Sequence, residues 1–220
     1  MAKRRVAVVG AGMGGLAAAL RLAASGFEVS VFERAASPGG KMRQVAIGDA
    51  RLDAGPTVFT MRWVSEELFA AAGASFKDYV RVAPLDILAR HAWPDGKRLD
   101  LFADVERTVD AIGAFADVGE AHRYREFNRR AKQVYETLEL GYIRAANATP
   151  LTLMRGAGLR GLPSLLQIRP FTNLWKALGD YFHDVRLRQL FARYATYCGS
   201  SPFLAPATLM LIAHVEQDGV

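Results

Sequence analysis

The sequence predicts an α/β fold that begins with a dinucleotide-binding unit of the Rossmann type. Three observations predict it: a glycine-rich turn near the N-terminus, a strand–turn–helix–strand pattern around that turn, and an acid where the second strand ends. The chain has 220 residues, of which 51% are hydrophobic and 23% charged. This composition supplies enough apolar material for one domain, or for a domain with an insertion.

The first predicted element is a buried strand over residues 5–9, where β-branched residues form a short apolar run. Good helix formers follow the glycines and stop at Gly26, a predicted C-cap. The alternating run 27–33 predicts a second strand. A secretory signal peptide is the alternative, since basic residues precede the apolar run. A signal core should be a continuous helix, however, and glycines interrupt this one.

Each residue of the motif has a predicted role in holding a dinucleotide. Gly10 allows a tight turn, Gly12 lets the backbone approach a pyrophosphate, and Gly14 and Gly15 let helix and strand pack closely. The helix N-terminus offers N–H groups and partial positive charge to the phosphates. Glu33 lies where an acid accepts a hydrogen bond from a ribose hydroxyl.

A second glycine turn, Gly39–Gly40, follows the acid and precedes Lys41 and Arg43. A nicotinamide-binding domain would normally continue into another helix and strand at this point. Cations neutralise phosphate, and glycines permit the close approach of a flat ring. These residues are therefore predicted to lie against the cofactor. The alternative is that the two cations form an ordinary solvated pair.

Further elements follow from periodicity and from turn residues. The predicted elements are a helix over 64–72 ending at Gly73, a hairpin of strands 86–93 and 97–103 turning at Pro94–Gly96, a helix over 105–115 capped by Asp104, a long helix over 120–142, a helix over 185–197, and a helix starting at Pro206.

Two groups of residues allow more than one interpretation. The long helix carries a stripe at helical spacing: Tyr124, Phe127, Ala131, Val134, Tyr135, Leu138 and Tyr142. The stripe either packs in the core or lines a pocket for a long apolar molecule. Cys198 shares a predicted face with Leu187, Leu190 and Phe191, so it is expected to be a packed apolar residue, the alternative being a reactive thiol.

The stretch 140–179 contains no Asp or Glu but several basic residues, among them Arg155, Arg160 and Arg169. An apolar, basic and acid-free stretch suits the surface of an anionic membrane, and the alternative is a lid over the core. Glycines and prolines interrupt it too often for it to span a bilayer. The net charge is +6, but no nucleic-acid motif is present, so no nucleic-acid partner is predicted.

The expected location is cytoplasmic and peripheral on the inner membrane. One cysteine cannot form an internal disulfide, which suits a reducing compartment. No metal site is predicted, because the histidines lack ligand spacing.

Three segments carry a family resemblance: "GAGMGGLAAALRLAASGFEVSVFERAASPGGKMR", "LDAGPTVFTMRWV" and "RYATYCGSSPFLAPATLMLIAHVEQDGV". They resemble the bacterial carotenoid desaturases of the phytoene desaturase type. The segments "DAGPTVFTMRWV" and "ILARHAWPDG" most resemble the hydroxyneurosporene and methoxyneurosporene desaturases, which act on 1-hydroxycarotenoids. The resemblance implies FAD, bound by a domain of the glutathione-reductase type, together with a mixed α+β substrate or lid region. The residues it assigns to FAD are Gly10, Gly12, Gly14, Gly15, Glu33, Arg34, Gly39, Gly40, Lys41, Arg43, Asp53, Gly55, Pro56 and Thr57.

The resemblance also implies an activity, which is desaturation of a hydroxycarotenoid at C3–C4 with hydride transfer to the flavin. The substrate would be a lipophilic polyene, and no catalytic residue is assigned. The alternatives are another amine-oxidase-type flavoprotein, such as a protoporphyrinogen oxidase relative, or a non-catalytic fragment of a desaturase.

Such desaturases are about twice as long as this chain, and their fold returns to the FAD domain near the C-terminus. The sequence is therefore expected to be the N-terminal portion, from a truncated gene, a split gene or a fragment. The expected parts are 1–83 for the FAD-binding domain, 84–205 for the substrate and membrane-contacting region, and 206–220 for the start of the return.

Overall fold

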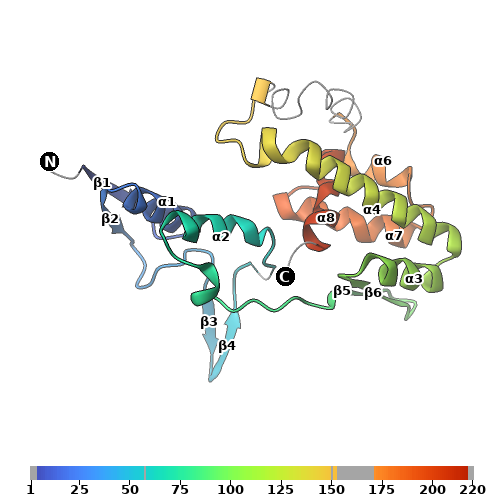
Figure 1. Ribbon diagram of the computed structural model, residues 1–220. Helices are drawn as coiled ribbons and strands as arrows, with labels where there is room; N and C mark the ends of the chain where they lie inside the picture. The colour runs from blue at the N-terminus through green and yellow to red at the C-terminus, as the bar shows by residue number, and fades with distance from the viewer. Residues whose placement is uncertain (1–3, 57, 150, 153–170, 218–220) are drawn as a thin grey trace. The chain divides into compact units, whose positions relative to one another are not determined.

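A computed structural model describes residues 4–56, 58–149, 151–152 and 171–217 of the chain (Figure 1). These residues form two compact units, divided between Pro84 and Leu85. Each unit is described by itself. The assignment of residues 206–220 to a return toward the first unit stays a prediction.

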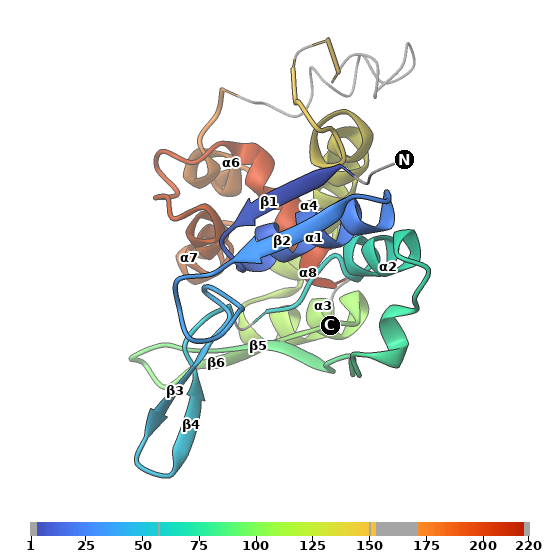
Figure 2. The ribbon, with the colours of Figure 1, turned by 90° about the vertical axis from the view of Figure 1, so that its left-hand side faces the viewer.

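The first unit contains the predicted strand–turn–helix–strand motif. Its elements are β1 (Arg5–Val9), α1 (Met13–Ala24), β2 (Glu28–Phe32), β3 (Gln44–Ile47), β4 (Ala50–Asp53), α2 (Arg62–Ala71) and the 3-10 turn η1 (Phe76–Asp78). β1 and β2 pair in parallel, and Figure 2 shows them side by side with α1 against them. Helix α1 begins three residues before the predicted start and so includes Gly14 and Gly15. Gly26, at φ +89°, follows its C-cap Ser25 as predicted.

An antiparallel hairpin of β3 and β4 follows, and it was not predicted. Gln44 pairs with Asp53 at its base and Ile47 with Ala50 at its tip. Gly48, at φ +59°, allows the chain to reverse there. The hairpin projects from the first unit in both views (Figures 1 and 2). The alternating residues on both sides of a Gly–Asp pair were the available signal.

The second unit begins with the predicted hairpin and continues as a helical bundle. Its elements are β5 (Ile87–Ala92), β6 (Arg98–Phe102), α3 (Val105–Phe115), α4 (Val118–Leu138), the π-helical turn η2 (Glu139–Ile143), α6 (Leu174–Gly179), α7 (Val185–Ala192), the 3-10 turns η3 (Arg193–Cys198) and η4 (Ala207–Leu211), and α8 (Ile212–Gln217). β5 and β6 pair antiparallel, with a bulge near Ile87. Asp104 caps α3 as predicted, since its Oδ1 accepts the N–H of Arg107 at 2.9 Å.

The stripe on α4 packs in the core of the second unit. Its first six residues are all buried, so the core interpretation is confirmed for them. The ring of Phe127, for example, lies 5.2 Å from that of Phe182 and 5.0 Å from that of Phe191. Tyr142 is the exception at 55% exposed. Helix α4 ends at Leu138, and the wider π-helical turn that follows moves Tyr142 off the stripe.

The predicted helix over 185–197 is shorter than expected. Helix α7 ends at Ala192, and the chain tightens into η3 up to Cys198, where Gly199 at φ +61° ends the turn. A 3-10 turn has three residues per turn, so the apolar face rotates along it. Cys198 is a free, exposed thiol as a result, and the expectation that it packs in the core is wrong.

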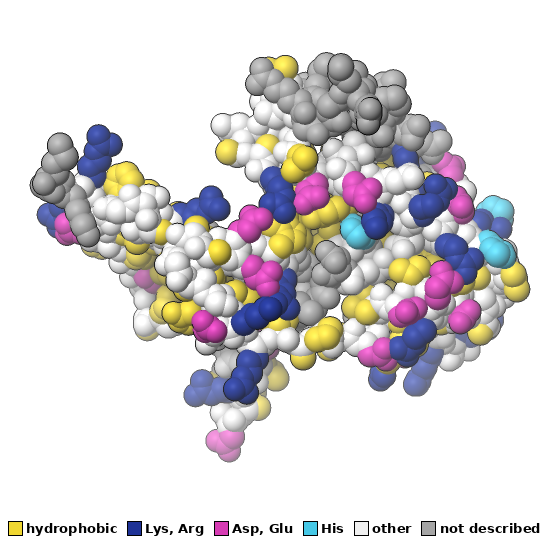
Figure 3. All heavy atoms as spheres, viewed as in Figure 1, with side chains coloured by type: hydrophobic (Ala, Val, Ile, Leu, Met, Phe, Trp, Pro, Cys, Tyr) yellow, Lys and Arg dark blue, Asp and Glu magenta, His cyan; other side chains and the backbone are white. Residues whose placement is uncertain are grey.

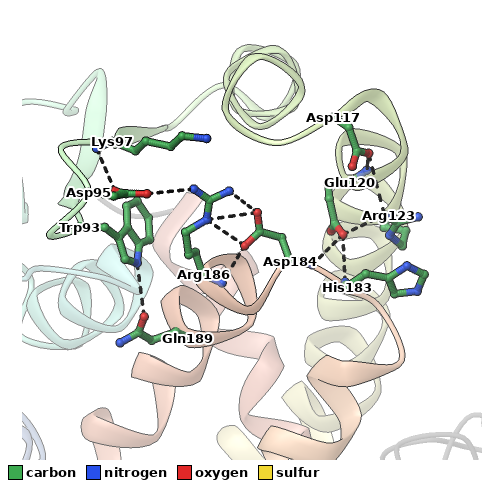
Figure 4. Close-up of polar contacts among 10 residues, drawn as sticks. All are labelled: Trp93, Asp95, Lys97, Asp117, Glu120, Arg123, His183, Asp184, Arg186 and Gln189. Atoms are coloured by element: carbon green, nitrogen blue, oxygen red, sulfur yellow. Dashed lines mark hydrogen bonds and ion pairs between the residues drawn. The ribbon is translucent and has the colours of Figure 1, made fainter.

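A buried carboxylate joins α4 to the loop before α7, as Figure 4 shows. Glu120 is 1% exposed. Its Oε1 accepts the backbone N–H groups of His183 and Asp184, both at 2.9 Å, and the guanidinium of Arg123 at 2.8 Å. This burial could not be predicted from the sequence, because an acid in the first turn of a helix usually faces solvent.

A second set of polar contacts joins α7 to the β5–β6 turn (Figure 4). Asp184 caps α7 and also pairs with the guanidinium of Arg186, which extends to Asp95 at 3.5 Å. The indole N–H of Trp93 donates to Gln189 at 3.3 Å. The Arg186 guanidinium holds the pKa of Asp184 below its ordinary value.

Within the described ranges, no helix has both the length and the apolarity needed to cross a membrane. The basic residues Arg155, Arg160 and Arg169 of the acid-free stretch lie outside those ranges.

Candidate functional site

The site is built around the loop between β1 and α1. Gly10, at φ +97°, donates its N–H to the carbonyl of Phe32 at 2.7 Å, which attaches the loop to the end of β2. A Cβ at Gly15 would lie 1.9 Å from the carbonyl oxygen of Gly10, so only glycine permits this contact between helix and loop. Gly14 has nothing within 4 Å of the equivalent position. The packing role predicted for both glycines therefore belongs to Gly15.

The N-terminus of α1 is open to an anion. Gly12 is its N-cap and offers no side chain, and the first turn has no acidic residue. The N–H groups of this turn point out of the helix end and carry its partial positive charge. A Cβ at Gly12 would have only the Cα of Gly40 near it, at 3.9 Å. The loop therefore has room for a phosphate group close to its backbone.

Glu33 lies against this loop. Its Oε2 accepts the N–H of Ala11 at 2.7 Å, and its Oε1 accepts the N–H of Ala35 at 2.8 Å. These N–H groups, that of Ala35 first, hold the pKa of Glu33 below its ordinary value. The acid is therefore ionised at neutral pH, beside the first glycine turn.

The second glycine turn packs directly on the first. Gly39 donates its N–H to the carbonyl of Ala11 at 2.8 Å. A Cβ at Gly40 would approach the Cα of Gly12 to 2.9 Å, so the two loops touch through backbone alone. Gly39 and Gly40 both have positive φ, at +119° and +61°. The structure thus brings the two predicted glycine turns into one site.

The predicted residues farther along the chain gather beside a hollow of about 270 Å³. Its lining includes Arg43, Asp53, Gly55 and Pro56. A Cβ at Gly55 would lie 2.1 Å from the carbonyl oxygen of Lys41, so this turn also touches the second glycine turn through backbone. Every one of these contacts is within the first unit.

Three predicted site residues have a less defined place. The side chains of Arg34 and Lys41 are exposed near the glycine turns. Thr57 lies outside the described residues. In the part of the chain that the structure describes, no group of three His, Cys, Asp or Glu side chains has metal-binding geometry.

Comparison with protein families identifies the domain that holds the site. The family of NAD(P)-binding Rossmann-like domains matches residues 8–72. The matched range begins in β1 and ends after α2, so it includes both glycine turns and Glu33. The predicted Rossmann-type fold is confirmed.

Two solved oxidoreductase structures share the fold of the described chain. Putrescine oxidase bound to putrescine matches with a TM-score of 0.55 and 16% identity, over 96% of this chain and 41% of that one. An oxidoreductase from Methanosarcina mazei matches with a TM-score of 0.52 and 15% identity, over 98% of this chain and 44% of that one. At such low identity the likeness concerns the fold alone.

Curated relatives match almost the whole chain in sequence. The hydroxyneurosporene desaturase of Rubrivivax gelatinosus is 56% identical over 98% of this chain, and that of Cereibacter sphaeroides is 43% identical over 98%. The 4,4'-diaponeurosporene oxygenase of Staphylococcus haemolyticus is 28% identical over 99%. The chain spans 41% of the first relative and 43% of each of the other two. The predicted resemblance is thereby confirmed: along nearly its whole length the chain is a homologue of the hydroxyneurosporene desaturases, and it spans less than half of theirs.

Proposed function

We propose that the first unit binds the ADP portion of FAD and that the chain is part of a carotenoid desaturase acting on a hydroxylated polyene. The observation that carries this is the joining of two glycine turns and an ionised acid at one helix N-terminus. The named relatives, two hydroxyneurosporene desaturases and a diaponeurosporene oxygenase, support the substrate class.

The residues present fit a dinucleotide. The N-terminus of α1 would hold the diphosphate, with Gly12 leaving space for it. Glu33 would accept a hydrogen bond from a ribose hydroxyl in addition to that from the N–H of Ala11. The turn at Gly39 and Gly40 would lie along the cofactor, and Lys41 would add positive charge near the phosphates.

The cofactor, when bound, supplies the oxidising power by accepting hydride from the polyene. The hollow lined by Arg43, Asp53, Gly55 and Pro56 is the proposed position of the ring side of the cofactor. In this role the chain binds and orients the cofactor and excludes water from it. No residue is assigned to proton transfer.

The experiment that tests the cofactor is a titration of the purified chain with FAD, ADP or NAD, followed by flavin fluorescence or calorimetry. Gly12→Ala is the decisive variant, because φ of −74° is ordinary for alanine and the added methyl meets only backbone at 3.9 Å. We expect the variant to fold and to bind FAD at least tenfold more weakly. Gly113→Ala, whose added methyl makes an ordinary 3.5 Å contact in the second unit, is the matched control.

Two outcomes would count against the proposal. Equal affinity of the Gly12→Ala variant and the parent chain would exclude this loop as the site. Absence of any flavin binding would favour the non-catalytic fragment of a desaturase, which is one of the alternatives stated from the sequence. Activity itself is tested with the full-length homologous gene, by following the red shift of a hydroxylated and of a hydrocarbon polyene. Activity on porphyrinogens instead would favour the protoporphyrinogen oxidase alternative.

We also propose that the region around residues 140–179 contacts a membrane surface. The described part of this stretch exposes Leu140, Tyr142, Leu151 and Phe171, and it contains no acid. Exposed apolar side chains with nearby cations favour an anionic bilayer surface. Elsewhere, on the face shown in Figure 3, basic and acidic side chains alternate over the second unit. Co-sedimentation with vesicles tests this, and equal binding to neutral and anionic vesicles would exclude the charge contribution.

A further inference from the structure

A separate hollow lies in the second unit at the C-terminal end of α4, and the proposed cofactor site does not use it. Its volume is about 510 Å³, within the range of roughly 300–1,000 Å³ that is typical of small-molecule sites. Four leucines, an alanine and a proline form most of the lining, together with Tyr142, Cys198, Ser200 and Thr208. Leu138 and Ala205 are buried and form its floor, whereas Leu204 is exposed at its rim.

The lining of this hollow carries no charged side chain. The hollow beside β5 and β6 differs, because Arg90, Arg98 and Asp100 line it. The hollow of the first unit likewise contains Arg43 and Asp53. Transfer of a charge into apolar surroundings is costly, so an uncharged hollow with leucine walls favours a neutral, apolar ligand.

Hydroxyl groups interrupt the apolar wall at separate points. Within the described residues, the hydroxyls of Tyr142 and Thr208 have no hydrogen-bond partner, and that of Ser200 has only a 3.5 Å contact to the carbonyl of Ser201. A few polar groups in an otherwise apolar site fix the orientation of a ligand. Each of these hydroxyls can donate to a ligand oxygen or accept from a ligand hydroxyl.

We propose that this hollow binds the hydroxylated end of the polyene substrate. The leucines contact the hydrocarbon, and Tyr142 and Thr208 hydrogen-bond to the terminal hydroxyl. Leu204 is exposed in the lining, and Leu140, which is exposed in the same π-helical turn as Tyr142, adds a further apolar side chain. The inference rests on the proposed function, from which it takes the substrate class. It adds where on the chain the polyene binds and which end of the polyene enters the hollow.

Cys198 provides a direct reporter, because it is the only cysteine of the chain, it is exposed and it lines the hollow. The experiment measures its alkylation rate by N-ethylmaleimide in the purified chain. The probes are a 1-hydroxylated acyclic carotenoid and the acyclic hydrocarbon of the same length, each in detergent micelles, with empty micelles as the reference. We expect the hydroxylated probe to slow alkylation at least threefold, and to do so at lower concentration than the hydrocarbon.

The double variant Tyr142→Phe/Thr208→Val removes both hydroxyls and keeps the apolar shape. We expect it to raise the concentration of hydroxylated probe needed for half-protection by about three- to tenfold, and to leave the hydrocarbon unchanged. Tyr79→Phe/Thr137→Val is the matched control, since Tyr79 is exposed, Thr137 is half-buried and neither lines the hollow. Its protection should equal that of the parent chain.

Quenching of tryptophan fluorescence by the polyene reports binding anywhere on the chain. Quenching without protection of Cys198 would place the polyene elsewhere and overturn the inference, while leaving the proposed function intact. Equal protection by both probes, unchanged in the double variant, would overturn the recognition of the hydroxyl. If the polyene causes no quenching and no protection, the proposed substrate class itself is overturned. None of these readouts requires FAD, so a failure of flavin binding is recognised separately.

Discussion

The two units of the chain bury their apolar residues to very different extents. In the first unit, Ala11 and Phe76 are the only buried hydrophobic residues among those described, whereas the second unit buries a continuous cluster from Leu99 to Ala213. The strands of the first unit expose Val9 to 87% and Phe32 to 58%. Parallel strands are normally covered on both faces. The difference teaches that backbone contacts and hydrogen bonds hold the glycine turns of the first unit together, while an apolar core holds the second unit together.

The largest expected effect comes from the second unit. Phe127→Ala removes a ring that is completely buried against Phe182 and Phe191. We expect a loss of about 3–5 kcal/mol in the free energy of unfolding, measured with urea. Phe171→Ala, at a fully exposed ring, should change it by less than ~0.5 kcal/mol. ADP binding by the first unit should be unchanged by Phe127→Ala in the absence of urea. Loss of ADP binding would show that the first unit depends on the core of the second unit.

Gly15→Ala tests the backbone contacts of the first unit. The added methyl would lie 1.9 Å from the carbonyl oxygen of Gly10, so helix and loop must separate. We expect a destabilisation of about 1–3 kcal/mol and loss of ADP binding, measured by limited proteolysis and calorimetry. The methyl added by Gly14→Ala meets open space within a helix, so the free energy of unfolding of this variant should rise by about 0.5–1 kcal/mol. Equal stability of the two variants would contradict the assigned role of Gly15.

Asp184→Asn tests the ion pair of the second unit through pH. The pKa of Asp184 is lowered from its ordinary 3.8, mainly by Arg186. Its contribution to stability is therefore fully present above about pH 4 and disappears as pH falls through the lower folded pKa. Asparagine retains the N-cap, so the variant isolates the charge. The difference between the urea midpoints of variant and parent should be largest at pH 6 and should shrink as the pH falls below about 4. A difference that stays constant with pH would show that the charge is irrelevant.

The smallest expected effect is that of Val9→Thr in the first unit. Val9 is 87% exposed, so the added hydroxyl remains solvated and the free energy of unfolding should change by less than ~0.5 kcal/mol. Val134→Thr places the same hydroxyl at a position that is 1% exposed, and should cost about 1–3 kcal/mol. A large effect of Val9→Thr would mean that the exposed strand face is covered in solution.

The sequence predicted those elements whose signals are local. The glycine turns, the Asp104 cap and the Pro94–Gly96 hairpin all depend on residues close in the chain, and the structure contains each of them. The β3–β4 hairpin was not predicted although its alternation was present, because each of its strands has only four residues and gives a weak signal.

Features that depend on tertiary packing could not be predicted. Burial of Glu120 requires the N–H groups of His183 and Asp184, which lie more than sixty residues away in the chain. The π-helical turn that exposes Tyr142 and the 3-10 turn that exposes Cys198 leave no distinct periodic signal over so few residues. The contact of Glu33 with Ala11 also depends on tertiary packing and was not predicted, although the position of the acid was.

The double attachment of Ala11 has a consequence for recognition. Its N–H is held by Glu33 and its carbonyl by Gly39, so the glycine turns are already ordered before any ligand arrives. The loop is preorganised, and the entropy of ordering it belongs to folding and not to binding. Under the proposed function, a ribose hydroxyl would bind a carboxylate that already holds two amides, because each carboxylate oxygen can accept more than one hydrogen bond. The amide of Ala11, held by the same carboxylate, is therefore the natural spectroscopic probe of occupancy.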